Sequence, residues 1–143
     1  MDPIGKKISK AIATLDNKLL QDVLDVLLAT IPAVLYGKVK EDIREANYHI
    51  LFLAMLSLMG FFVIGERPNS KGTPDIIIKK DNLIVVCELK YSLDEPLEHL
   101  ATEAIKQIKD NEYYKPYLDY DVVLLAIAFG DREVKSLLEP LKK

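Results

Sequence analysis

Apolar positions along the chain change their period near residue 60. Before this point they recur every three or four residues, as Ile8 and Ile12 do, which is the period of a helix that buries one face. The pattern predicts helical structure over about 4–31 and 38–58, with an interruption at Pro32. The second of these segments is polar at its start and almost wholly apolar later, so we expect its second half to be enclosed by other elements.

Beyond residue 60, short apolar runs bounded by turn residues replace the helical period. They predict strands over 61–65, 76–79 and 83–91. The segment 66–74, rich in Pro, Asn, Ser and Gly, is predicted to be a loop, and the second and third strands are close enough to form a hairpin.

The last third of the chain predicts one more helix and strand, followed by a final helix. Apolar residues at helical spacing predict a helix over about 97–114, and the continuous apolar run 122–129 is typical of a strand covered on both faces. A last helix is predicted to begin near Asp131. This order favours an α/β fold, a mixed β-sheet flanked by helices. We expect residues 1–37 to form an N-terminal helical extension, packed on the core or in a dimer contact, and 38–143 to form the main domain.

Composition fits an ordinary globular protein, with 50% hydrophobic and 29% charged residues in 143. The net charge of −3 means that binding to nucleic acid would need local basic patches or a metal ion. Candidate patches lie at 6–10, 79–80 and 142–143, although short lysine clusters are more often plain solvated surface.

A single cysteine, Cys87, excludes an intramolecular disulfide. It is expected to fill a small core position in a reducing interior, which favours a cytoplasmic location. The apolar stretch 50–64 is too short to span a membrane.

Charged residues stand where two predicted strands begin or end. Asp75 precedes one apolar run, and Glu88 and Lys90 lie at the end of the next. Since side chains alternate between the two faces of a strand, Glu88 and Lys90 point the same way, and a hairpin would bring Asp75 close to them. Adjacent carboxylates repel unless a cation lies between them, and Mg²⁺ prefers such ligands. The alternative is an ion pair at a strand end that serves only solubility and register.

Several motifs follow one another along the chain. The central ones are Pro74-Asp75 and Glu88-Leu89-Lys90; the others are "REANYH", "GERPNSKGTPDIII", "VVCELKY", "AIKQIKDNEYY" and "LLAIAFG". In this order they resemble the motifs of the PD-(D/E)xK nuclease superfamily, over about Asp16 to Gly130. More closely, the chain is similar to the nuclease domain found C-terminal to AAA-ATPase-like modules. The resemblance implies a restriction-endonuclease-like fold.

The resemblance also implies a role for individual residues. Asp75 and Glu88 would be ligands of Mg²⁺ or Mn²⁺, and Lys90 would be the catalytic lysine. Glu45 matches the acidic residue of the first core helix that supports the metal or its water, and Gln107 matches a helix glutamine near the active site. The implied activity is metal-dependent hydrolysis of phosphodiester bonds in nucleic acid, with DNA as the expected substrate. Structural roles remain open for Glu45, as the polar end of a helix, and for Gln107, as a hydrogen-bonded structural residue.

Two departures from the family pattern keep other functions open. The segment 71–74 reads Lys-Gly-Thr-Pro where relatives commonly carry Gly-Arg. The sequence has no phosphate-binding loop motif, so any coupling to nucleotide hydrolysis would need a separate ATPase partner. The main alternative is a non-catalytic accessory protein that keeps the fold and binds nucleic acid or protein. Another is a structural subunit in which the charged residues only pair with one another.

Overall fold

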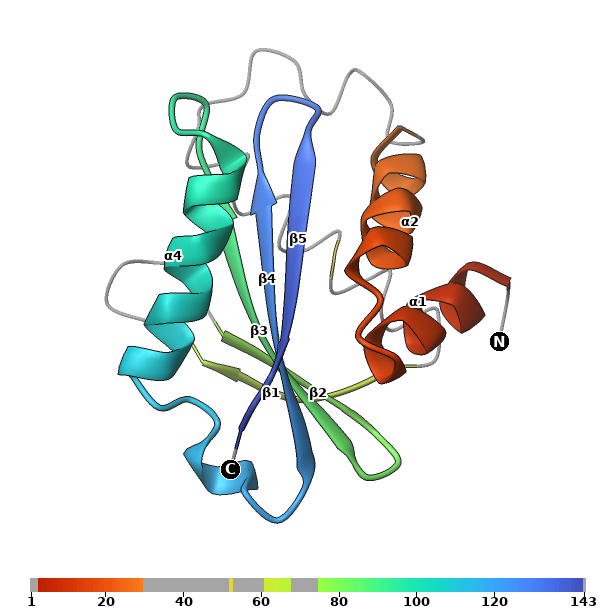
Figure 1. Cartoon of the computed structure of the whole chain (residues 1–143), viewed down its shortest axis with the longest axis vertical. Helices are drawn as coiled ribbons and strands as arrows, with labels where there is room; N and C mark the ends of the chain where they lie inside the picture. The colour runs from red at the N-terminus through yellow and green to blue at the C-terminus, as the bar shows by residue number, and fades with distance from the viewer. Residues whose placement is uncertain (1–2, 30–51, 53–60, 68–74, 143) are drawn as a thin grey trace.

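A computed structural model describes residues 3–29, 52, 61–67 and 75–142 of the chain (Figure 1). Its elements are the helices α1 (Pro3–Ala13), α2 (Asn17–Ala29) and α4 (Leu97–Asp110), a short 3₁₀ turn (Lys115–Tyr117), and the strands β1 (Phe62–Arg67), β2 (Asp75–Lys80), β3 (Leu83–Tyr91), β4 (Asp121–Phe129) and β5 (Val134–Pro140). The helix predicted over 38–58 lies outside the described residues except for Phe52, and so does the expected domain boundary at residue 37.

The five strands form one mixed sheet in the order β1-β2-β3-β4-β5. Neighbouring strands are antiparallel except β3 and β4, which run parallel. The connection from β3 to β4 passes through α4, as a parallel pair requires. The predicted α/β class, with a mixed sheet flanked by helices, is therefore confirmed.

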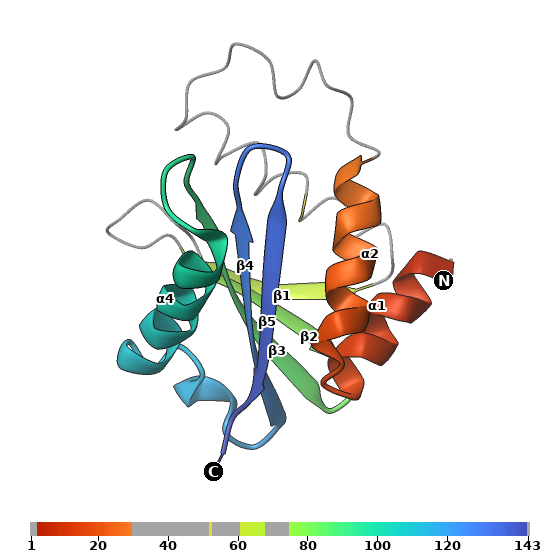
Figure 2. The same ribbon diagram turned by 45° about the horizontal axis from the view of Figure 1, so that its top comes forward.

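Helices cover the two faces of the sheet separately. In Figures 1 and 2, α4 lies on one side of the strands and α1 and α2 lie on the other. Each face has its own apolar cluster. On β3, Cys87 and Leu89 belong to the α1–α2 side, while Ile84 and Val86 belong to the α4 side, as the alternation along a strand predicts. Cys87 is fully buried, as expected.

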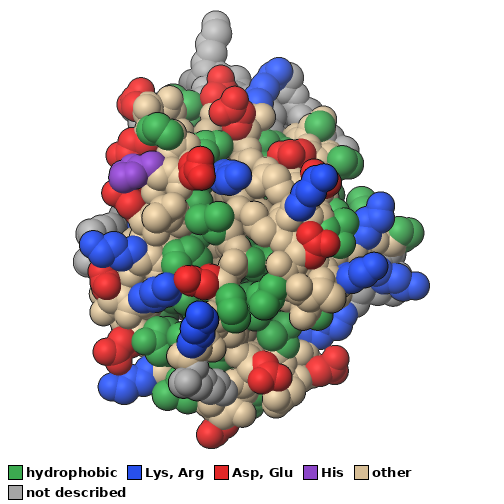
Figure 3. All heavy atoms as spheres, viewed as in Figure 1, with side chains coloured by type: hydrophobic (Ala, Val, Ile, Leu, Met, Phe, Trp, Pro, Cys, Tyr) green, Lys and Arg blue, Asp and Glu red, His purple; other side chains and the backbone are tan. Residues whose placement is uncertain are grey.

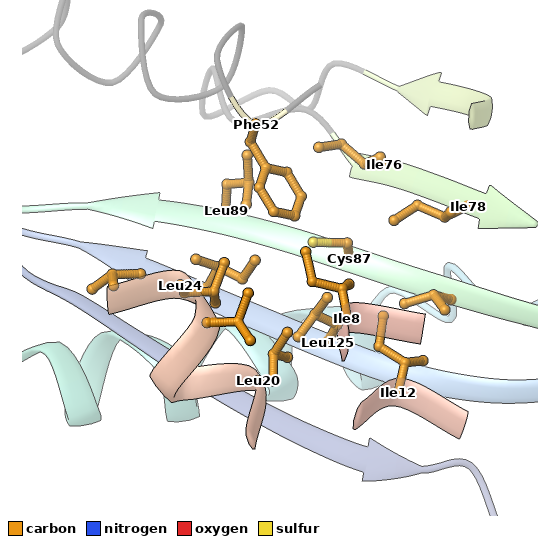
Figure 4. Packing of buried hydrophobic residues seen from close by; sticks show 14 of the residues in the cluster. Ile8, Ile12, Leu20, Leu24, Phe52, Ile76, Ile78, Cys87, Leu89 and Leu125 are labelled. Atoms are coloured by element: carbon orange, nitrogen blue, oxygen red, sulfur yellow. The ribbon is translucent and has the colours of Figure 1, made fainter. Parts of the chain in front are cut away.

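The core on the α1–α2 side is built from parts of the chain that are distant in sequence. Figure 4 shows side chains of α1 and α2 packed against β2, β3 and β4, with Phe52 above them. The labelled residues are Ile8, Ile12, Leu20, Leu24, Phe52, Ile76, Ile78, Cys87, Leu89 and Leu125. The N-terminal helices thus bury their apolar stripes on the sheet. Of the exposed large apolar residues in this region, Val26 lies on α2 and Leu15 lies in the turn between the two helices.

Side-chain hydrogen bonds fix α2 at its start and against the sheet edge. The backbone N–H of Leu19 donates to Asp16 Oδ1 at 3.0 Å, which caps the helix. One turn further on, Gln21 Nε2 donates to the carbonyl oxygen of Val134 at 2.6 Å, and the N–H of Ser136 donates to Gln21 Oε1 at 2.7 Å. The amide of Gln21 therefore forms hydrogen bonds with backbone groups of the edge strand β5. Without it, these groups could pair with a further strand.

Two predictions about secondary structure are wrong. The segment after Asp131 is the strand β5 and not a helix, because Val134 and Ser136 alternate inward and the strand pairs with residues 123–129 of β4. In addition, β1 runs to Arg67, so the first two residues of the predicted loop 66–74 are in the sheet. In both segments, pairing with a neighbouring strand outweighs the local sequence pattern.

No helix in the described ranges is long and apolar enough to cross a membrane.

Replacing Gln21 with Ala should lower the free energy of unfolding by about 1–3 kcal/mol, because backbone groups of Val134 and Ser136 lose their partners. Replacing Asp22, its exposed neighbour on α2, with Ala should change it by less than about 0.5 kcal/mol. Urea unfolding monitored by circular dichroism measures both. Equal effects of the two substitutions would mean that the Gln21 amide does not stabilise the edge.

Candidate functional site

The strand register aligns charged residues in one row across the sheet. Arg67 of β1 pairs with Asp75 of β2, Asp75 pairs with Glu88 of β3, and Glu88 pairs with Ala126 of β4. Residues directly opposite each other in an antiparallel pair have Cβ atoms only about 5 Å apart and lie on the same face. The two predicted carboxylate positions are therefore immediate neighbours, at the end of the β2–β3 hairpin away from its turn.

Glu88 lies in the interior of the molecule. Its exposed fraction is 0%, and the only other polar residue in the described core is Ser136. Because Glu88 alternates with Cys87 and Leu89, it lies on the α4 face of β3. A carboxylate in such a place costs several kcal/mol to bury in its charged form unless cations or hydrogen-bond donors surround it.

Lys90 lies on the same face two residues later and contacts α4. Its Nζ donates a hydrogen bond of 2.5 Å to Gln107 Oε1, and both side chains are half-buried. Gln107 is placed there because Ala104 and Ile108 on either side of it pack into the apolar cluster beneath the helix. The contact holds the ammonium group of Lys90 on the face of the sheet that carries Glu88.

The residues at this edge fit a hard divalent cation. Carboxylate oxygens are the ligands that Mg²⁺ and Mn²⁺ prefer, and one or two carboxylates suffice when water and substrate oxygens complete the shell. The paired positions of Asp75 and Glu88 supply two carboxylates from adjacent strands. Lys90, held by Gln107, adds a cationic group on the same face, two residues further along β3. The expected ligand set of Asp75, Glu88 and Glu45 stays a prediction, and the structure describes the strand positions of the first two.

Not every predicted site residue is described. Glu45 lies outside the described residues, and for Asp75 the structure gives the strand position. Sequence analysis missed Arg67, whose register position opposite Asp75 adds a basic residue to the row. Arg67 lies in a segment whose composition predicts a loop. Because β1 ends in Gly-Glu-Arg, its last residues lack the apolar alternation that identifies a strand.

A second group of possible metal ligands lies at the start of α4. Ligand atoms of Glu95, His99 and Glu103 lie within 4.8 Å of one another, and His99 Nε2 is 3.1 Å from Glu103 Oε1. All three side chains are exposed, and His99 and Glu103 are one helical turn apart. Pairs of this kind are common on helix surfaces. His99 is thus a surface residue, as its position before the apolar stripe predicts.

The four tyrosines after α4 pack on the protein. Tyr113, Tyr114, Tyr117 and Tyr120 are partly buried against the apolar cluster on the α4 side. Lys79 Nζ lies 5.2 Å from the centre of the Tyr120 ring. These contacts agree with a packing role for the tyrosines.

Comparison with known protein families places these residues in context. The profile of the PD-(D/E)XK nuclease superfamily matches residues 43–137, which is more than half of the chain. The matched segment includes Glu45, Asp75, Glu88, Lys90 and Gln107, together with the whole sheet except the end of β5. No curated protein is a significant match. With a five-stranded mixed sheet between helices, the fold is restriction-endonuclease-like. The chain belongs to the PD-(D/E)XK nuclease superfamily.

Proposed function

We propose that this protein is a metal-dependent nuclease that hydrolyses phosphodiester bonds, with DNA as its substrate. The proposal rests mainly on the strand register, which pairs Asp75 with the buried Glu88. Lys90, whose side chain is held by Gln107, lies on the same face of β3 as Glu88. Family membership supports the reaction class. The spacing of charges supports it independently, since an ion pair that serves only solubility does not need a fully buried carboxylate.

Asp75 and Glu88 are the proposed ligands of Mg²⁺ or Mn²⁺, and Glu45 is proposed to support the metal or its water. When bound, the ion would polarise the phosphate and lower the pKa of a water molecule. Lys90 would place its positive charge where negative charge develops on the phosphate oxygens. Gln107 accepts the hydrogen bond from Lys90 Nζ and so restricts the position of that charge before substrate arrives.

Other parts of the proposal rest on sequence and family alone. The cytoplasmic location, a homodimer and a separate ATPase partner stay predictions. The alternative of an accessory protein without catalysis differs in one respect. Such a protein would bind nucleic acid or protein without a metal-dependent loss of substrate.

Replacing Glu88 with Gln should abolish cutting while leaving the fold intact, because the amide keeps the shape of the side chain and removes its charge. We expect kcat to fall by at least about 100-fold. Labelled single-stranded and duplex DNA and RNA, incubated with and without Mg²⁺ or Mn²⁺, provide the measurement. Asp110→Asn, at the exposed end of α4, is the matched control and should cut at the wild-type rate. Metal-dependent cutting that survives in Glu88→Gln would contradict the assigned site. Binding without cutting by the wild-type protein would favour the accessory protein.

Replacing Gln107 with Leu should lower kcat by about 10- to 100-fold with little change in KM, because Lys90 loses the acceptor that orients it. Gln107→Glu keeps an acceptor oxygen at that position and should retain more activity than the Leu variant.

Lys90→Met should lower kcat by about 10²- to 10³-fold. Adding Gln107→Leu to Lys90→Met should then cost little more, since the two residues act as one unit. Losses that simply multiply in the double variant would show that Gln107 does not act through Lys90.

A further inference from the structure

A cavity lies at the turn end of the β2–β3 hairpin, opposite the end that carries the candidate metal site. Its volume is about 420 Å³, and it opens between α1 and the hairpin turn. Figures 1 and 2 both show α1 beside this turn. The register places Lys80 opposite Leu83 at this end and Asp75 opposite Glu88 at the other. At about 3.4 Å per residue, the two ends of β2 are roughly 17 Å apart. The cavity is therefore separate from the candidate metal site.

One wall of the cavity carries a half-buried lysine. Lys80 Nζ donates a hydrogen bond of 2.7 Å to Ser9 Oγ of α1 and lies 5.6 Å from the centre of the Phe61 ring. No carboxylate of the described residues forms an ion pair with it. A half-buried ammonium whose described partners are a hydroxyl group and a ring face retains the capacity to bind an anion.

More positive charge surrounds that wall. Lys10 also lines the cavity, and Lys6 and Lys7 are exposed on the same helix. Figure 3 shows basic side chains gathered over α1, at the right of that view. In a chain with a net charge of −3, this is a local reversal of sign.

The remaining lining contains both apolar and polar side chains. The apolar residues, here called the floor, include Ile12, Phe61 and Leu83. Asp81, Asn82 and Asp121 also line the cavity; they are exposed and lie at or beside the hairpin turn. Their oxygens can accept hydrogen bonds from N–H groups of a ligand.

We propose that this cavity binds a nucleotide, with the phosphate at Lys10 and Lys80 and the base on the apolar floor beside Phe61. The exocyclic amine of the base faces Asp81 and Asp121. A fatty acid would offer no N–H donor to Asp81 and Asp121, and inorganic phosphate would leave the floor unused. The volume lies within the range of small-molecule sites. The site goes beyond the proposed nuclease function, since it needs neither the metal nor Lys90.

Isothermal titration calorimetry in metal-free buffer with EDTA tests the proposal apart from any cutting. Adenosine 5′-monophosphate should bind more tightly than uridine 5′-monophosphate, which lacks an exocyclic amine, and far more tightly than inorganic phosphate. Lys10→Gln should weaken the binding of adenosine 5′-monophosphate at least about 10-fold, since one phosphate contact of a charged group is lost. Lys106→Gln, on the exposed face of α4, is the matched control and should leave the affinity unchanged.

A second variant tests the cavity itself. Ala13 is exposed and lines the cavity, so Ala13→Trp should fill part of the space and abolish binding without unfolding the protein. Thermal melting checks the fold of each variant. The proposal is overturned if wild-type protein binds no mononucleotide, if Lys10→Gln and Ala13→Trp bind as the wild type does, or if decanoate binds and adenosine 5′-monophosphate does not. Metal-dependent cutting is measured separately, so its presence or absence does not bear on these outcomes.

Discussion

The antiparallel register of β2 and β3 is the constraint on which the account of this protein depends. The turn at Asp81 and Asn82 fixes which residues of the two strands pair. The resulting register places Asp75 opposite Glu88. A slip of one residue would move the apolar residues of one strand to the opposite face. It would also separate the two carboxylate positions. The burial of Ile76 and Ile78 against α1 and α2 therefore helps to hold the register of the candidate site.

The two faces of the sheet differ in the residues that they carry. The α1–α2 side is an apolar core that fixes β2, β3 and β4 in place. The α4 side carries the apolar cluster beneath the helix and, toward the ends of β3 and β2, the charged row. Because α4 follows β3 directly and crosses to β4, its Gln107 comes to lie over Lys90. The crossover that the parallel pair requires thus also supplies the partner of the lysine.

Much of this arrangement can be predicted from the sequence. The apolar runs of β3 and β4 and the stripe of α4 are long and regular, so their periods identify them, and alternation places Glu88 and Lys90 on one face. Other features depend on contacts between distant segments. β5 has the composition of a helix and becomes a strand because it pairs along β4. Arg67 joins the charged row only because β1 pairs with β2. The contact of Gln107 with Lys90 follows from the packing of α4, and spacing alone gives no sign of it.

The central claim is that a divalent ion binds between the carboxylates of Asp75 and Glu88. Crystals of the protein soaked in MnCl₂ test it directly, since anomalous scattering from manganese locates the ion without reference to activity. A strong peak bonded to oxygens of both carboxylates is expected, together with its loss in crystals of Glu88→Gln. A peak confined to the exposed group of Glu95, His99 and Glu103, or no peak beside Glu88, would contradict it.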